Sequence, residues 1–376
     1  MLDHDNVFLL AVFSVFASSA AIQLFYYLFY YLAVYVHKPS GIKSTKQPVS
    51  IIICARNEAE NLRNFLPAVL EQDYPDYEVI VVNDCSEDNS YDILGKYLIQ
   101  YPHLKISTVN KDAKFTHNKK LAQFIGIKAA KNDILLFTDA DCRPESDKWL
   151  EGMTSHFDDK ITFVLGYGGF LKEKGFLNKY IRYDSMTIAM QYLGMAIRGT
   201  PYMGVGRNLA YRRSVFFMNK GYGSHTHLIS GDDDLFVNKH ASRSNTAVEF
   251  RNGTHTRSVP CSGLKEWIIQ KKRHLTTAPY YKFKDKLLLI TEPVTRILFY
   301  SAFIILLSFS FLWPFVLAVF GLRFITQIIV LALVQKKLKE PGLITYSLFF
   351  DIFSSVINSI VFLSNIRNRS RKNKWK

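Results

Sequence analysis

Two aspartates, Asp139 and Asp141, follow an apolar run in the segment LLFTDADCRP, residues 135–144. A short apolar run of this kind is typical of a buried strand, so the two carboxylates stand where that strand ends. Carboxylate oxygens at alternate positions can hold one hard divalent cation together with a diphosphate. Acidic residues are also common in ordinary loops, so this motif alone does not separate a metal site from a loop.

Acidic residues follow two earlier apolar runs as well. The run at residues 49–55 leads into ARNEAEN, which contains Glu58, and the run at residues 77–84 ends at Asp84 in NDCSEDNS. Taken singly, each of these residues is more simply a helix cap or a turn residue. Their joint position favours a shared site instead, because ligands of open α/β sheets bind beyond the carboxyl ends of the strands.

The elements that must position these residues alternate between strand and helix. Strands are predicted at residues 49–55, 77–84, 105–110 and 133–141, the first, second and fourth of them buried. Helices are predicted between them, at residues 62–70, 90–100 and 118–132. The repeated strand–helix–strand order predicts an α/β fold with a mostly parallel sheet covered by helices.

Apolar segments flank this polar body on both sides. Residues 7–36 carry no charged side chain and exceed the roughly 20 residues that a membrane-spanning helix needs. Because they follow MLDHDN and not a basic leader, we expect a retained transmembrane helix and no cleaved signal peptide. Residues 297–334 predict a helical hairpin with Trp313 and Pro314 near its turn, and Arg323 in its second arm would need a partner or a watery cavity.

A last apolar segment, residues 343–366, contains Asp351 and Asn358. A full crossing would place the basic tail RNRSRKNKWK outside, against the positive-inside tendency, whereas an interfacial or re-entrant helix would not. The sequence leaves both topologies open. We expect three parts overall: a helix and basic linker at 1–46, a catalytic domain at 47–286, and a membrane region with its tail at 287–376.

The net charge of +15 is explained in part by basic residues beside the apolar segments. Lys38, Lys43 and Lys46 follow the first segment, which places the polar body in the cytoplasm and the protein in the inner (plasma) membrane as a multi-pass protein. Juxtamembrane cations contact anionic headgroups, and the sequence shows no nucleic-acid-binding module, so nucleic acid is not an expected partner. The four cysteines form no C-x-x-C pair, which indicates free thiols in a reducing compartment.

Taken in order, the motifs between residues 48 and 279 resemble those of the family 2 glycosyltransferases, which use nucleotide sugars and have the GT-A fold. The membrane flanks resemble the branch that contains the cellulose, hyaluronan and poly-N-acetylglucosamine synthases. The resemblance implies a Rossmann-like GT-A domain with transmembrane helices at both ends. It also implies that Asp139 and Asp141 bind a divalent cation, Mg²⁺ or Mn²⁺.

The same resemblance assigns further roles motif by motif. Residues implied to bind the nucleotide sugar are Ala55, Arg56, Glu58, Asp84, Ser86, Lys119, Lys120, Asp139, Gln270 and Arg273. The segment GVGRNLAYRRSVF would line the sugar and acceptor pocket with Gly204, Gly206, Arg207 and Asn208. SGDDDLF would carry the catalytic base: alignment by its glycine gives Asp233, which we expect, and alignment by its leucine gives Asp232. Crowded carboxylates raise one another's pKa, which helps such a group accept a proton near neutrality.

The implied activity is inverting transfer of a sugar from a nucleoside diphosphate sugar, a UDP-sugar in the first instance, to a lipid-linked or polysaccharide acceptor at the membrane during cell-envelope glycan synthesis. QKKRH resembles the Q-x-x-R-W motif of processive members, but His274 replaces its tryptophan. Single transfer is therefore favoured over chain elongation. The alternatives are a processive polysaccharide synthase, an inactive membrane-tethered nucleotide-sugar-binding protein, and a nucleotidyltransferase that would release pyrophosphate.

The segment EWIIQKKRH also fits a second interpretation. It is typical of an amphipathic helix resting on a membrane, with Trp267 near the headgroups and Lys271, Lys272 and Arg273 facing lipid phosphates.

Overall fold

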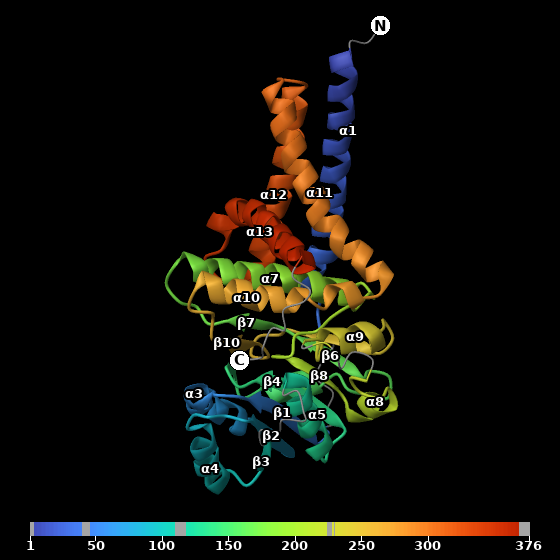
Figure 1. Ribbon diagram of the computed structural model, residues 1–376. Coiled ribbons are helices and arrows are strands. Elements are labelled where there is room, and N and C mark those ends of the chain that lie inside the picture. Colours follow the sequence, from blue (N-terminus) through green and yellow to red (C-terminus); the bar gives the residue numbers. More distant parts are fainter. Residues whose placement is uncertain (1–3, 40–45, 110–117, 224–227, 229, 368–376) are drawn as a thin grey trace.

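The computed structural model describes residues 4–39, 46–109, 118–223, 228 and 230–367 of the 376-residue chain. Lys43 and the tail beyond Arg367, both part of the charge pattern above, lie outside these residues. Figure 1 shows a body built around a sheet at one end and a stalk of long helices at the other.

Within the described residues, seven strands form the main sheet in the order β3-β2-β1-β4-β8-β6-β9. The strands β1 to β4 are parallel to one another, and β8 runs antiparallel to both β4 and β6. These first four strands and the helices between them confirm the predicted α/β order. The bounds of the strands are Val49–Ala55 for β1, Tyr77–Asp84 for β2, Leu104–Val109 for β3, Ile134–Asp139 for β4, Phe163–Gly166 for β6, Leu209–Arg212 for β8 and Thr246–Glu249 for β9.

Helices cover both faces of the parallel strands, which is why β1 is buried at every position. Ile52 of β1 belongs to one apolar core together with Ala122 of α5 (Lys119–Ala129). Ile51 belongs to a second core together with Leu62 of α3 (Ala59–Leu70) and residues of α4 (Ser90–Gln100). Alternate side chains of a strand point to opposite faces, so one β-branched run supplies both cores.

The register of the strands brings the predicted site residues to one edge. Ala55 of β1 pairs with Asn83, and Cys54 pairs with Asp139. After β4 the chain enters a second, three-stranded sheet, in which β10 (Thr256–Ser258) lies between β5 (Cys142–Pro144) and β7 (Gly168–Phe170). Asp141 therefore lies at the junction of the two sheets.

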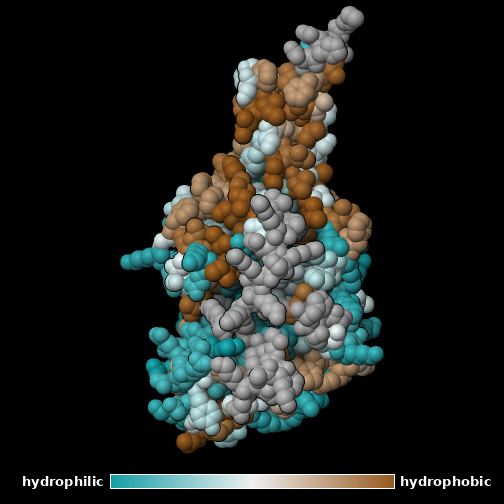
Figure 2. Space-filling model, in the orientation of Figure 1, coloured by the Kyte–Doolittle hydropathy of each residue, from teal (hydrophilic) through white to brown (hydrophobic). Residues whose placement is uncertain are grey.

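Among the residues that the structure describes, four segments are long and apolar enough to cross a membrane: Asn6–Val36, Phe283–Ser308, Trp313–Lys337 and Ile344–Val361. The first comprises α1 (His4–Phe25), a π-helical stretch (Tyr26–Tyr31) and α2 (Leu32–Val36). The expected hairpin is present as α11 (Phe283–Ser308) and α12 (Trp313–Lys337), although its first arm begins earlier than Ile297. Apolar side chains dominate the stalk and hydrophilic ones the far end of the body (Figure 2).

The last apolar segment, residues 343–366, for which the sequence left two topologies open, forms α13 (Ser347–Arg367). It lies across the foot of the stalk, where it contacts α7 (Phe176–Ile197), α10 (Leu264–Leu275) and α11 (Figure 1). This arrangement fits a helix at the membrane interface better than a fourth crossing parallel to the stalk.

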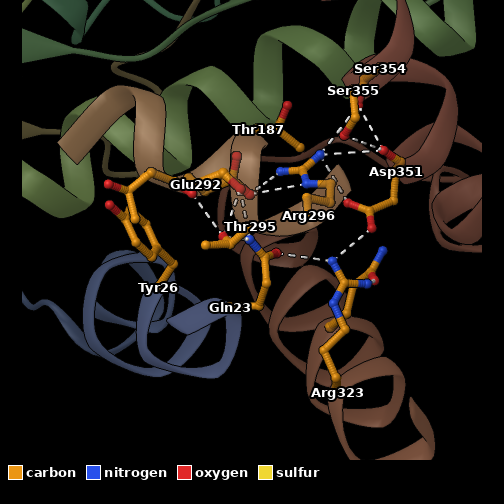
Figure 3. Close-up of polar contacts among 12 residues, drawn as sticks. Gln23, Tyr26, Thr187, Glu292, Thr295, Arg296, Arg323, Asp351, Ser354 and Ser355 are labelled. Atoms are coloured by element: carbon orange, nitrogen blue, oxygen red, sulfur yellow. Dashed lines mark hydrogen bonds and ion pairs between the residues drawn. The ribbon is translucent and has the colours of Figure 1, made fainter. Parts of the chain in front are cut away.

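Arg323 has the partners that its position in an apolar helix requires. Its Nη2 lies 2.8 Å from Asp351 Oδ2 and donates to Gln23 Oε1 at 3.1 Å (Figure 3). Asp351 also pairs with Arg296, whose Nη1 lies 3.0 Å from Asp351 Oδ1. These contacts join α1, α11, α12 and α13 through buried polar groups.

Candidate active site

A cavity of about 590 Å³ lies between the carboxyl edge of the main sheet and the helices α7, α10, α11 and α13. Segments that are far apart in the sequence converge at its sheet end. The predicted site residues that line the cavity are Lys119, Asp139, Asp141, Gly206, Arg207, Asp232, Asp233, Gln270 and Arg273. The lining also includes residues that the sequence did not single out, among them Gly168, Phe170 and Ser258.

Asp139 and Asp141 face a common point, as a metal site requires. One ligand atom from each, together with Cys142 Sγ, lies within 4.8 Å of the others. The two carboxylates suit a hard cation such as Mg²⁺ or Mn²⁺. Cys142 is buried and differs from the two carboxylates. Burial and the charges of Asp141 and Asp139 raise the pKa of its thiol well above the ordinary value, and its Sγ lies 2.8 Å from Ser258 Oγ.

Lys119 stands against this pair of carboxylates. Asn118 caps α5 by accepting a hydrogen bond from the Leu121 N–H, which places Lys119 in the first turn of the helix, at the sheet edge. Lys119 Nζ lies 2.5 Å from Asp139 Oδ1 and 3.8 Å from Asp232 Oδ2. Burial acts to raise the pKa of Asp139, but the charge and hydrogen bond of Lys119, together with the charges of Arg207 and Arg273, hold that pKa below the ordinary value. Burial and the Asp139 charge raise the pKa of Asp141.

Lys120 does not share this position. Its Nζ donates to the Leu228 carbonyl at 2.9 Å, its side chain is buried, and burial lowers its pKa to about 8. Of the two lysines expected to reach a diphosphate, Lys119 is therefore the one that faces the cavity.

Three consecutive aspartates precede or begin α9 (Asp234–His240), and each has a different environment. Asp233 is half-buried and faces the cavity, where its Oδ2 accepts a hydrogen bond from the Gly206 N–H at 2.6 Å. Asp232 is buried beside Lys119. Asp234 accepts hydrogen bonds from Thr277 Oγ1 and, at 2.7 Å, from the Tyr281 hydroxyl, so it ties α9 to the segment after α10. Burial, followed by the charges of Asp232 and Asp234, raises the pKa of Asp233 to about 7.

The residues expected to contact the nucleotide lie at the same sheet edge but beside a second hollow. This hollow, of about 520 Å³, is lined by Asn83, Cys85, Ser86, Glu87, Tyr91, Thr108 and Val109. The loops after β1 and β2 are joined here, because the Asn57 N–H donates to Ser86 Oγ and the Glu87 N–H donates to Asn57 Oδ1.

Four of the expected nucleotide residues surround this junction without lining the 590 Å³ cavity. Asp84 is buried at the end of β2, between two residues that line the hollow. Ala55 ends β1, Arg56 follows it, and Glu58 accepts a hydrogen bond from Asn61 Nδ2 at 2.6 Å.

Two residues of GVGRN do not reach the cavity, contrary to expectation. Asn208 is fully buried, where it donates to the carbonyls of Tyr167 and Thr254 and accepts from Trp149 Nε1. Gly204 faces apolar side chains, since a Cβ there would lie 2.9 Å from Leu209 Cδ1. Gly206 and Arg207 line the cavity as expected.

The expected lipid-facing role of α10 is also wrong for two residues. Trp267 is buried, and Lys271 Nζ lies 2.6 Å from Asp184 Oδ2 on α7. The reason is that α10 packs against α13 and also contacts α7 through the rings of Trp267 and Tyr180, so one of its polar groups must find a partner inside the protein. Gln270 and Arg273 reach the cavity, as the resemblance implied.

The membrane end of the cavity was not anticipated from the sequence. It includes Glu292 and Arg296 of α11 and a row of polar residues on α13. The available signal was the pair of opposite charges four residues apart at the edge of an apolar segment, where they share one helix face.

Residues 50–217 match the model of the family described as Glycosyl transferase family 2. Glycosyltransferase AglE of Haloferax volcanii is 35% identical over 147 residues, which cover 38% of this chain and 46% of AglE. A poly-beta-1,6-N-acetyl-D-glucosamine synthase of Staphylococcus epidermidis is 29% identical over 109 residues, covering 28% of this chain and 25% of that one. The matched segments thus span less than half of either relative.

Among solved structures, the mannosyltransferase PcManGT from Pyrobaculum calidifontis, in complex with GDP-Man and Mn²⁺, resembles the whole chain. The TM-score is 0.60 at 18% identity, with 94% of this chain and 97% of that chain covered. The likeness shows the fold, including the membrane flanks. Residues 50–217 thus match the Glycosyl transferase family 2 model, and the chain has the GT-A fold, joined to helices that are long and apolar enough to cross a membrane.

Proposed function

We propose that the protein is a metal-dependent, inverting glycosyltransferase that moves a sugar from a nucleoside diphosphate sugar to a hydroxyl group of a membrane-associated acceptor. The observation that carries this proposal is that Asp233 lines the same cavity as Asp139 and Asp141, although these residues come from distant parts of the chain. A proton acceptor and a candidate diphosphate site thus face one space.

On the donor side, Asp139 and Asp141 would hold a cation, Mg²⁺ or Mn²⁺, which would supply positive charge opposite the leaving diphosphate. Lys119, Gln270 and Arg273 line the same cavity, where they would contact the diphosphate. Asp84 and Ser86, at the second hollow, lie near the base. The complex of PcManGT with GDP-Man and Mn²⁺ supports a nucleotide sugar and a divalent cation for this fold.

On the acceptor side, Asp233 takes the proton of the attacking hydroxyl group. The acceptor oxygen forms a bond to the anomeric carbon while the bond from that carbon to the diphosphate oxygen breaks. The electron pair of the broken bond leaves with the nucleoside diphosphate, and a single displacement of this kind inverts the anomeric centre. A pKa of about 7 leaves Asp233 both ionised and adequately basic near neutrality.

The apolar helices on both sides of the catalytic domain support a reaction at the membrane. The cavity continues toward α11 and α13, which supports an acceptor that resides in the membrane. The lysines after the first apolar helix favour a cytoplasmic body on the inner (plasma) membrane. Similarity to a poly-beta-1,6-N-acetyl-D-glucosamine synthase supports a role in cell-envelope glycan synthesis.

The test is to incubate the purified protein with a panel of UDP- and GDP-sugars and Mn²⁺, and to measure release of nucleoside diphosphate. At least one donor is expected to release it, and NMR of the product should show the inverted anomer. Release of pyrophosphate would indicate a nucleotidyltransferase instead. No release from any donor, with or without membrane lipids, would refute the enzymatic function.

A further inference from the structure

The cavity that contains Asp233 continues beyond the sheet edge to the apolar helices. Among the apolar side chains of its far wall stand polar ones: Thr187 and Gln191 from α7, Glu292 and Arg296 from α11, and Ser355 and Asn358 from α13. The segments that contain the last four are long and apolar enough to enter a membrane. Polar groups in such segments are costly, so their exposure to a cavity indicates a ligand.

The charges at this wall cancel. Arg296 is paired with Glu292 and with Asp351, and Asp351 is also paired with Arg323 (Figure 3). Two cations thus face two anions, and Arg296 has no charge to spare for a phosphate. Glu292 itself lines the cavity and would repel an anion. The wall therefore suits an uncharged polar ligand.

The α13 helix has two different faces. Val356 and Ile360 are 50% and 61% exposed on its outer side, whereas Ser354, Ser355, Asn358 and Ser359 line the cavity. Ser355 Oγ donates to the Asp351 carbonyl at 3.1 Å, and Ser359 Oγ donates to the Ser355 carbonyl at 2.8 Å. Hydroxyl groups that donate to their own helix keep lone pairs for accepting hydrogen bonds from a ligand.

The side-chain carbonyl group of Asn358 is an acceptor without a hydrogen-bond donor in the described structure. Its Oδ1 is shielded from solvent and accepts no hydrogen bond from the residues that the structure describes. A shielded carbonyl without a donor costs free energy, which a ligand hydroxyl would recover. A row of acceptors is the surface that sugar hydroxyl groups require.

The same end of the cavity has an apolar rim. Ile290, Val294 and Ile297 of α11 line it, and each is also more than a third exposed on the surface. A ligand that passes this rim has an apolar part, and one that reaches the acceptor row has hydroxyl groups. Both requirements are met by one amphiphilic molecule.

We propose that the membrane end of the cavity binds the uncharged, hydroxyl-rich head of a glycolipid acceptor, whose hydrocarbon chain leaves past α11 and whose reacting hydroxyl group reaches Asp233. This inference rests on the proposed function for the reaction, while the binding itself can be measured without turnover.

The experiment compares Asn358→Leu with Val356→Leu in full-length protein held in nanodiscs. Asn358→Leu removes an acceptor inside the cavity, whereas Val356→Leu introduces the same leucine on the outer face of the same helix without removing a polar group. The probes are decyl β-glycosides of glucose, galactose, mannose and N-acetylglucosamine, with methyl β-glucoside and decyl phosphate as comparisons. Binding is measured by native mass spectrometry, and thermal unfolding verifies the fold of each variant.

At least one decyl glycoside is expected to bind the wild type, more tightly than methyl β-glucoside or decyl phosphate. Loss of the Asn358 hydrogen bond should weaken this binding about tenfold, and Val356→Leu should leave it unchanged. If Asn358→Leu unfolds, Ser359→Ala supplies the same comparison with a smaller change and a severalfold loss.

Equal binding in the two variants, absence of binding by every decyl glycoside, or tighter binding of decyl phosphate would each overturn the proposal. Glycoside binding that is lost in Asn358→Leu, in a protein that releases no nucleoside diphosphate from any donor, would support the lipid site and refute the proposed function alone. The two failures are thereby distinguishable.

Discussion

Asp233 accepts a hydrogen bond from the backbone N–H of Gly206 at 2.6 Å, and a Cβ at Gly206 would lie 3.2 Å from the same carboxylate oxygen. The contact joins the segment after α7 to the start of α9 and holds Asp233 at the cavity wall. It also leaves the second carboxylate oxygen with only the neighbouring Asp234 N–H as a partner in the described structure. These two hydrogen bonds therefore hold Asp233 in position and leave lone pairs on its carboxylate that can accept a proton.

Replacement of this carboxylate tests its role as the base. Asp233→Asn keeps an oxygen that can accept from Gly206, so the fold should persist. Loss of a positioned proton acceptor should lower the transfer rate on the order of 10² to 10⁴. Nucleoside diphosphate release at saturating donor measures it, with the exposed Asp147→Asn as control. Turnover within tenfold of the wild type would reject Asp233 as the base.

The pH dependence follows from the raised pKa of the same group. Asp233 must be ionised to accept a proton, so kcat/KM should rise with pH up to about 7 and then level off. Asp232 raises this pKa, so Asp232→Asn should move the acid limb of the kcat/KM profile to lower pH.

The pKa of Asp233 in the folded protein lies above its ordinary value, so ionisation of Asp233 destabilises the fold above pH 7. Asp233→Asn should then unfold at the same or a higher temperature than the wild type at pH 8.

The proposed metal ion would compete with Lys119 for Asp139. Because Lys119 Nζ lies 2.5 Å from Asp139 Oδ1, a cation bound there is repelled by the ammonium group. Lys119→Met should tighten Mn²⁺ binding in the absence of nucleotide, whereas Lys119→Arg should not. Electron paramagnetic resonance of free Mn²⁺ during titration measures both. Weaker Mn²⁺ binding in Lys119→Met would show that Lys119 supports the metal site instead.

The buried pair of Arg323 and Asp351 should dominate the stability of the helix bundle. Removing one member of a buried ion pair typically costs about 3 to 5 kcal/mol, because the other charge is left without compensation. Arg323→Met should therefore lower the unfolding temperature strongly in detergent, and Arg323→Met with Asp351→Leu should recover part of the loss. The exposed Lys239→Met serves as control. An unchanged unfolding temperature in Arg323→Met would contradict this view.

The parallel half of the sheet could be predicted from the sequence, because β1 and β2 are continuous β-branched runs that are buried on both faces. The positions of Asp139 and Asp141 followed from the same rule, since both come where a strand ends. It was harder to predict which side chains of one motif face the cavity and which are buried elsewhere. Asn208 and Lys120 are polar residues beside true cavity residues, and only tertiary packing decides which side chain turns inward.

The second half of the sheet and the polar face of α13 were not predictable for a related reason. The strands β6, β8 and β9 are four residues each, which is too short for a clear periodicity. Ser354 and Asn358 line a cavity only because α7 and α11 contribute its other walls.

Whether the separate acidic residues converge around one cation and one diphosphate can be decided by locating that cation. A structure of the protein with Mn²⁺ and a nucleoside diphosphate, with the metal identified by its anomalous signal, would do so. We predict one peak bound by carboxylate oxygens of both Asp139 and Asp141 and by the diphosphate, with Asp233 facing the same space. A peak that touches neither carboxylate, or a diphosphate bound away from them, would contradict the account.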